Sequence, residues 1–150
     1  MHLLNISRKK GKIRNLLQGN AEKLPFKDGI FPYILLTDVL EHVLHPSLVL
    51  EEIYRVSAKD GLFILSVPND KLINRCKKIA QYLRLSKYFI TEYHRPCKKS
   101  GNVKMDWHIH EFTLKKMKDL LKKRWNINNL RCIPNILMPF QFLFFLSPKK

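Results

Sequence analysis

Two histidines and two short polar stretches are the parts of this 150-residue sequence that can do chemistry. His42 and His110 are candidate acid–base groups, because imidazole titrates near neutral pH. His42 closes the stretch Thr37–His42 (TDVLEH), and the second polar stretch, Ser66–Asn69 (SVPN), follows further along the chain. The alternative role for His42 is a structural hydrogen bond within its loop, and the sequence leaves both interpretations open.

A strand–helix–strand unit is expected to position these polar stretches. Ile34–Thr37 (ILLT) and Leu62–Val67 (LFILSV) are apolar runs without alternation, which is typical of parallel strands covered on both faces. Between them Pro46 suits the first turn of a helix, Asp60-Gly61 predicts a turn, and three apolar residues recur at helical spacing: Val49, Ile53 and Val56. Because ligands bind at the carboxyl ends of parallel strands, both polar stretches fall where a site is expected.

The rest of the chain predicts five further elements. Lys12–Gln18 (KIRNLLQ) is a candidate strand, and residues 1–11 before it are a basic, poorly patterned lead-in. Asp70 is the expected N-cap of a helix with one apolar stripe (Leu72, Cys76, Ile79 and Leu83), and Thr113 caps a third helix. Two apolar segments, Asn126–Cys132 and Pro139–Leu146, predict the closing strands.

Several motifs in this order resemble class I S-adenosylmethionine (SAM)-dependent methyltransferases of the methyltransferase type 11 subgroup. The motifs lie between about Ile13 and Trp125, and in chain order they are Asn20–Phe26 (NAEKLPF), Asp38–His42 (DVLEH), Glu52–Val56 (EIYRV), Gly61–Ile64 (GLFI), Val67–Asn69 (VPN) and His110–Thr113 (HEFT). The sequence departs from the family twice. Pro32 follows Phe31 where the family usually has Asp, and the family's glycine-rich loop is absent because the chain begins near the family's third strand.

The resemblance implies one α/β domain over residues 1–150, with a Rossmann-like class I methyltransferase fold that is incomplete at its N-terminus. Its mostly parallel sheet is expected to have an antiparallel closing edge. SAM is the implied cofactor, with Asn20 and Ala21 beside its adenine and Thr37 and Asp38 beside its methionine end. Asn20 stands where the family usually has Asp, and its alternative role is that of an ordinary turn residue.

The resemblance also suggests roles on the acceptor side. Residues 86–110 would form a loop or lid over the acceptor. Four residues, Asp38, Glu41, His42 and His110, resemble the divalent-metal site of some quinone-pathway O-methyltransferases and small-RNA terminal methyltransferases. Two carboxylates and two imidazoles suit an octahedral hard or borderline cation. Many subgroup members have the Glu-His pair without a metal, so a metal-free site is the first expectation.

The charge of the chain is unevenly distributed. Residues 71–124 hold 16 Lys/Arg against 4 Asp/Glu, a balance of +12, whereas residues 1–70 hold 9 against 8, a balance of +1. Either an anionic partner faces this middle region or its helices are simply solvated. The three cysteines form no CxxC pair and no apolar stretch is long enough to cross a bilayer, which favours a cytoplasmic protein, soluble or peripheral to the membrane.

The expected function is SAM-dependent methylation of a small-molecule or lipid-linked, anionic acceptor. The alternative is a non-catalytic basic module that binds nucleic acid or an anionic membrane and has kept half of an enzyme fold. Aromatic residues among the basic ones, and Leu137 followed by phenylalanines, motivate that alternative. Because two strand–helix units of the family are missing, we expect the isolated chain to bind SAM weakly or not at all. Activity would then need an upstream segment or a partner chain that supplies the missing strands.

Overall fold

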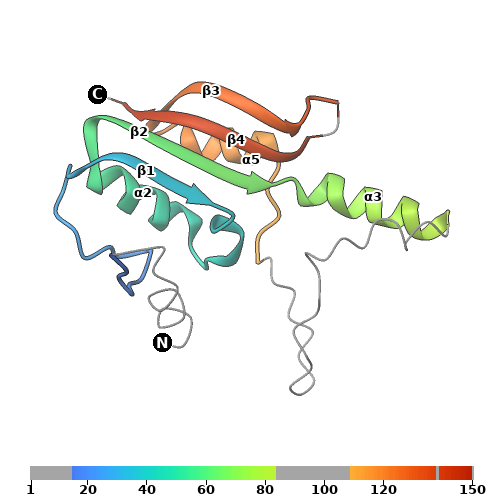
Figure 1. Ribbon diagram of the computed structural model, residues 1–150, viewed down its shortest axis with the longest axis horizontal. Coiled ribbons are helices and arrows are strands. Elements are labelled where there is room, and N and C mark those ends of the chain that lie inside the picture. The colour runs from blue at the N-terminus through green and yellow to red at the C-terminus, as the bar shows by residue number, and fades with distance from the viewer. Residues whose placement is uncertain (1–14, 84–108, 138, 150) are drawn as a thin grey trace, which may run out of the picture.

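The strands of the described residues form one four-stranded sheet in the order β1-β2-β4-β3 (Figure 1). The computed structural model describes residues 15–83, 109–137 and 139–149. β1 (Phe31–Thr37) and β2 (Ser57–Pro68) are parallel, whereas β4 (Pro139–Pro148) is antiparallel to both β2 and β3 (Trp125–Pro134). The predicted α/β fold, a parallel sheet with an antiparallel closing edge, is confirmed.

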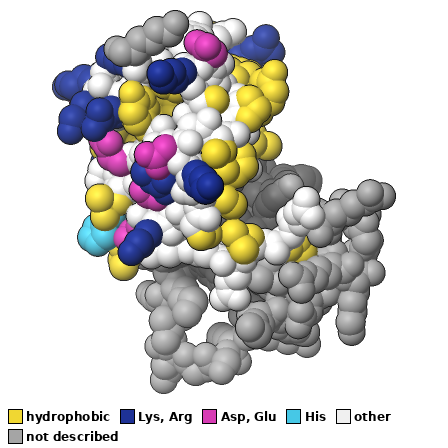
Figure 2. Space-filling model, turned by 90° about the vertical axis from the view of Figure 1, so that its left-hand side faces the viewer, with side chains coloured by type: hydrophobic (Ala, Val, Ile, Leu, Met, Phe, Trp, Pro, Cys, Tyr) yellow, Lys and Arg dark blue, Asp and Glu magenta, His cyan; other side chains and the backbone are white. Residues whose placement is uncertain are grey.

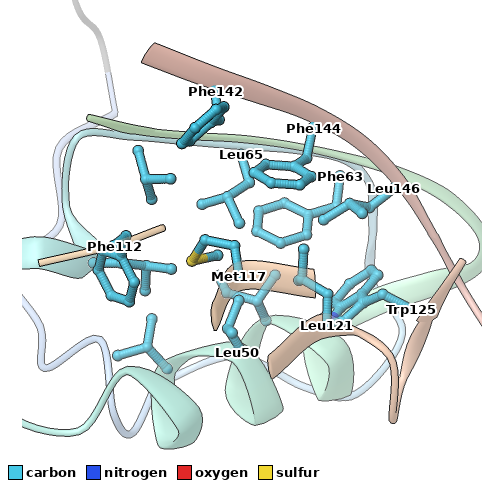
Figure 3. Packing of buried hydrophobic residues seen from close by; sticks show 14 residues of the cluster. Leu50, Phe63, Leu65, Phe112, Met117, Leu121, Trp125, Phe142, Phe144 and Leu146 are labelled. Carbon is cyan, nitrogen blue, oxygen red and sulfur yellow. The ribbon is translucent and has the colours of Figure 1, made fainter. Parts of the chain in front are cut away.

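Two helices cover one face of this sheet. α2 (Pro46–Val56) starts at the predicted proline, and its buried residues include Val49, Ile53 and Val56, as their spacing predicted. α5 (Leu114–Leu121) is capped by Thr113, whose side chain accepts a hydrogen bond from the Lys116 N–H at 3.3 Å. Figure 3 shows how residues of both helices meet the strands in one core, which includes Leu50, Met117, Leu121, Phe63, Leu65, Trp125, Phe142, Phe144 and Leu146.

The opposite face of the sheet is apolar, but neither α2 nor α5 covers it. The strand register places Tyr33 and Leu35 of β1 on this face, beside half-buried residues of β2 and β4: Leu62, Ile64, Leu143 and Phe145. Tyr33 is 77% exposed and Leu35 is 67% exposed. The apolar runs therefore predicted the parallel strands correctly, but the expectation that both faces of β1 are covered is wrong for the structure described.

Two local expectations need correction. Residues 15–18 of the candidate strand Lys12–Gln18 are not in a strand, and β1 is an edge of the sheet. Asp60-Gly61 lies within β2, in an irregular stretch where Phe31 pairs with Ser57 and Tyr33 with Leu62, and not in a turn.

The helix α3 (Asp70–Tyr82) corrects two more expectations. Its capping side chain is that of Asn69, which accepts a hydrogen bond from the Leu72 N–H at 3.4 Å, and Asp70 is already the first helical residue. Ile79 and Leu83 of its predicted inward stripe are exposed. The expectations for residues 1–11 and for residues 86–108 of the acceptor loop lie outside the described residues. None of the described helices is long and apolar enough to cross a membrane.

Candidate functional site

Three polar side chains meet at the carboxyl ends of the parallel strands. Asp38 follows β1, Ser66 lies near the end of β2, and Gln141 lies near the start of β4. Asp38 Oδ1 accepts hydrogen bonds from Gln141 Nε2 at 2.8 Å and from Ser66 Oγ at 3.1 Å. Gln141 Nε2 is also 3.2 Å from Ser66 Oγ. One carboxylate oxygen is thus fixed by two neighbouring strands.

The backbone of Asp38 is also held in place by a hydrogen bond to β2. Its φ angle is 52°, in the left-handed region that non-glycine residues rarely adopt. The Asp38 N–H donates to the Ser66 carbonyl at 3.2 Å, so the chain turns sharply while it is still attached to β2. Asp38 remains exposed, so a ligand can reach it, and a strained residue supported by its neighbours is typical of functional positions.

Sequence reasoning selected Thr37 and Asp38 at this edge but missed Gln141. Thr37 pairs with Ser66 in the sheet and is exposed, next to the three-residue polar cluster. Gln141 had a usable signal, since it is the single polar residue between Pro139 and Leu146 in an otherwise apolar strand. A lone amide in such a strand has to find a hydrogen-bond partner, and here it finds Asp38.

The two candidate acid–base histidines lie around the short 3₁₀ helix η1 (Leu40–His42). The N–H groups of Ile109 and His110 both donate to the Glu41 carbonyl, at 2.8 and 3.2 Å. His110 Nε2 is 3.1 Å from the Leu44 carbonyl, which requires that this nitrogen carries the proton. This hydrogen bond gives His110 a clear structural role. In the neutral imidazole, only Nδ1 is then free of a proton and able to act as a base.

The side chain of His42 is more exposed to solvent than that of His110. Its ring is exposed, and its Nε2 lies 3.9 Å from Oε1 of the buried Glu41. All four residues of the metal hypothesis are described, and the structure brings Glu41 close to His42 and to the backbone of His110. Within the part of the chain that the structure describes, however, no three His, Cys, Asp or Glu side chains form a group that could hold a metal ion.

The turn proposed to lie beside the adenine is held by its own hydrogen bonds. Asn20 Oδ1 accepts from the Glu22 N–H at 2.9 Å, and the Lys23 N–H donates to the Asn20 carbonyl at 3.0 Å. The side-chain oxygen of Asn20 is therefore used within the turn, which leaves its amide N–H groups to face a ligand. Ala21 is partly buried and packs against the core.

An ion pair on α2 holds the segment that follows this turn. Arg55 donates to both carboxylate oxygens of Glu52, at 2.8 and 2.9 Å, and also to the carbonyls of Leu24 and Phe26. Glu52 accepts in addition from the Leu24 N–H at 2.9 Å. The Arg55 hydrogen bond, followed by that from Leu24, lowers the pKa of Glu52 from 4.5 to about 2. The same contacts, with Asp28, raise the pKa of Arg55 above its usual value.

A cavity of about 1060 Å³ lies at the other end of the parallel strands, far from Asp38. Its charged lining includes Glu52 with Arg55, and Glu51 with Arg124 at 3.0 Å. Figure 2 shows this end of the molecule, where basic and acidic side chains are intermixed and hydrophobic ones gather along one side. Because these charged side chains pair with one another, their contacts contribute to the stability of the fold.

Comparisons with known proteins show which fold the chain shares. Residues 2–65 match the family model of a methyltransferase domain. No match was found among curated proteins. The PH0226 protein of Pyrococcus horikoshii OT3 superposes with a TM-score of 0.67 and 18% identity, over 97% of this chain and 65% of its own. A SAM-dependent methyltransferase of Thermotoga maritima gives 0.62 and 20%, over 99% of this chain and 69% of its own.

A third solved structure contains bound ligands. It is the 1,6-didemethyltoxoflavin-N1-methyltransferase of Burkholderia thailandensis with 1,6-didemethyltoxoflavin and S-adenosylhomocysteine (TM-score 0.59, 14% identity, 99% of this chain and 56% of that one). The chain thus spans about two thirds or less of the length of these proteins. At such identities the structures show a shared fold, and the resemblance predicted from the motifs is confirmed: this chain has the fold of the class I SAM-dependent methyltransferases.

Proposed function

We propose that the chain forms part of a SAM-dependent methyltransferase that acts on a small-molecule or lipid-linked, anionic acceptor. The observation that carries the proposal is the exposed carboxylate of Asp38, fixed by Ser66 and Gln141 at the carboxyl ends of two parallel strands. A carboxylate at this position suits a cationic or hydroxyl-bearing part of the cofactor. Asn20 and Ala21 remain our proposal for the adenine side.

Methyl transfer from a sulfonium is an in-line displacement, so the protein contributes mainly by positioning. The cofactor supplies the methyl group. The chain's own part is to hold the ligand at the Asp38 edge, and a general base is needed only if the acceptor must lose a proton. For that role we propose His42, because its ring is exposed, whereas His110 has its Nε2 engaged with the Leu44 carbonyl.

The proposed anionic acceptor rests on charge near this edge. α3 begins immediately after β2, and it exposes Lys71, Arg75 and Lys78. Reversing these three charges should weaken the binding of a phosphorylated or carboxylated acceptor, most strongly at low salt. If the chain instead binds RNA with a steep salt dependence and binds no cofactor, the non-catalytic binding module is the better description.

Cofactor binding can be tested by saturation-transfer NMR with S-adenosylhomocysteine, which detects weak complexes. We expect transfer to the ligand from the wild-type chain, with an affinity weaker than micromolar, and loss of transfer in Asp38→Asn. Asp119→Asn is the matched control, since Asp119 pairs with Lys122 on the outside of α5 and should not matter. Absence of transfer to the wild-type chain, or an equal effect of both variants, would contradict the proposal.

A further inference from the structure

Two neighbouring elements expose apolar side chains at the end of the molecule where the parallel strands finish. In the turn between β3 and β4, Ile136 is 81% exposed and Leu137 is 87% exposed. Asn135 Oδ1 accepts a hydrogen bond from the Leu137 N–H at 3.1 Å, so the conformation of this hairpin tip is fixed by its own turn. On α3 and just after it, three more large apolar residues are exposed: Ile79, Tyr82 and Leu83.

The two elements are joined at their bases. Asn69, the residue before α3, donates from its backbone N–H to the Phe140 carbonyl and from its side chain to the Pro139 carbonyl, both at 2.8 Å. α3 and the hairpin tip therefore leave the sheet from the same end, and Figure 1 shows both extending beyond it. Three exposed cations, Lys71, Arg75 and Lys78, lie on α3 before these exposed apolar residues in the chain.

We propose that this end of the molecule is a docking surface for an anionic lipid membrane. We call it the α3–hairpin surface, and it consists of Ile79, Tyr82, Leu83, Ile136 and Leu137 with the cations Lys71, Arg75 and Lys78. A basic amphipathic helix beside an exposed apolar tip is the combination that binds at a membrane interface, where apolar side chains enter the acyl boundary and cations meet the headgroups. Each Lys or Arg near an anionic surface strengthens binding about fivefold.

The charge of the chain favours a membrane over a second copy of the chain as the partner of the α3–hairpin surface. The net charge of +16 opposes self-association but favours an anionic surface. The docked surface adjoins the Asp38 edge through Asn69, so a membrane-bound molecule would present that edge to lipid-linked acceptors. Vesicle binding needs no SAM, so this inference and the proposed cofactor site succeed or fail separately.

The test is sedimentation of the 150-residue chain with vesicles of phosphatidylcholine alone and with about one third phosphatidylserine. We expect binding to the anionic vesicles only, at least tenfold weaker for the double variant Ile136→Ser/Leu137→Ser. Leu35→Ser is the matched control, because Leu35 is exposed to a similar degree on the open sheet face and should not affect binding. Leu137→Trp should show a blue shift of its fluorescence when the anionic vesicles are added.

Three results would overturn the inference. The first is no binding to anionic vesicles, and the second is binding that Leu35→Ser and the double variant weaken equally, which indicates non-specific adsorption. The third is a concentration-dependent dimer, seen by analytical ultracentrifugation and lost in the double variant, which would make this surface an interface between copies. Unchanged thermal unfolding of the double variant would show that the fold is intact, since both substituted residues are exposed.

Discussion

The ion pair between Glu52 and Arg55 gives the sharpest prediction about stability. Arg55 and the Leu24 N–H lower the pKa of Glu52 from 4.5 to about 2, a difference of about 2.5 units. At about 1.36 kcal/mol per unit, this corresponds to at most about 3.4 kcal/mol of folding free energy. Glu52 is 20% exposed and water screens the pair, so we expect Glu52→Gln to cost about half of that, about 1.5–2 kcal/mol.

Glu51 is a matched control on the same helix. Its carboxylate pairs with Arg124 at 3.0 Å, but it is 41% exposed, so Glu51→Gln should cost no more than about 0.5 kcal/mol. The two variants remove the same charge from adjacent residues. A difference between them therefore reports the environment of Glu52 and not the net charge of the chain.

The pH dependence of the same variant is an independent check. The pKa of Glu52 is lower in the folded protein than in the unfolded chain, so its stabilisation is complete above about pH 4.5 and is lost as the pH falls towards about 2. Urea unfolding followed by circular dichroism should show the wild type and Glu52→Gln converging over this range. Equal costs for Glu51→Gln and Glu52→Gln at pH 7, or a difference that does not shrink in acid, would refute the reasoning.

Two further predictions concern packing. Gly61→Ala should destabilise the protein by about 1–3 kcal/mol in urea unfolding. The reason is that an added Cβ would lie 2.9 Å from the Ala58 carbonyl oxygen and 3.2 Å from that of Phe31. A substitution without effect on stability would mean that this part of β2 is packed less tightly than described. Leu65→Ala, in the core, should cost about 2–5 kcal/mol, whereas Leu35→Ala should cost less than about 1 kcal/mol. Equal costs would mean that the face bearing Leu35 is covered in solution.

The sequence predicted the local elements well because their signals are local. Pro46 and the apolar spacing of α2, the Thr113 cap of α5 and the two closing strands all depend on residues within one element. The errors concern what lies against each element. Ile79 and Leu83 belong to a predicted apolar stripe, but periodicity does not show whether anything covers a stripe, and both residues are exposed.

The candidate site likewise contains residues that local sequence predicts and one that only strand pairing brings there. Thr37 and Asp38 could be selected because they lie where an apolar strand ends, and this position is local information. Gln141 lies 103 residues further along the chain than Asp38, so only the pairing of β4 with β2 brings it to the carboxylate. The left-handed backbone conformation of Asp38 could not be predicted from the sequence either. No glycine marks this position, and the conformation is held by the hydrogen bonds between Asp38 and Ser66.

The two ends of the parallel strands therefore differ in how their polar contacts affect the free energy of the folded state. At one end the Glu52–Arg55 pair fixes residues 24–28 to α2 with hydrogen bonds that lower the free energy of the folded state. At the other end Asp38 keeps a conformation that costs about 1 kcal/mol, and Ser66 and Gln141 hold it there. A strained residue held in place by its neighbours is typical of functional positions, and this supports our proposal that a ligand binds at Asp38 and not at the ion-paired cavity.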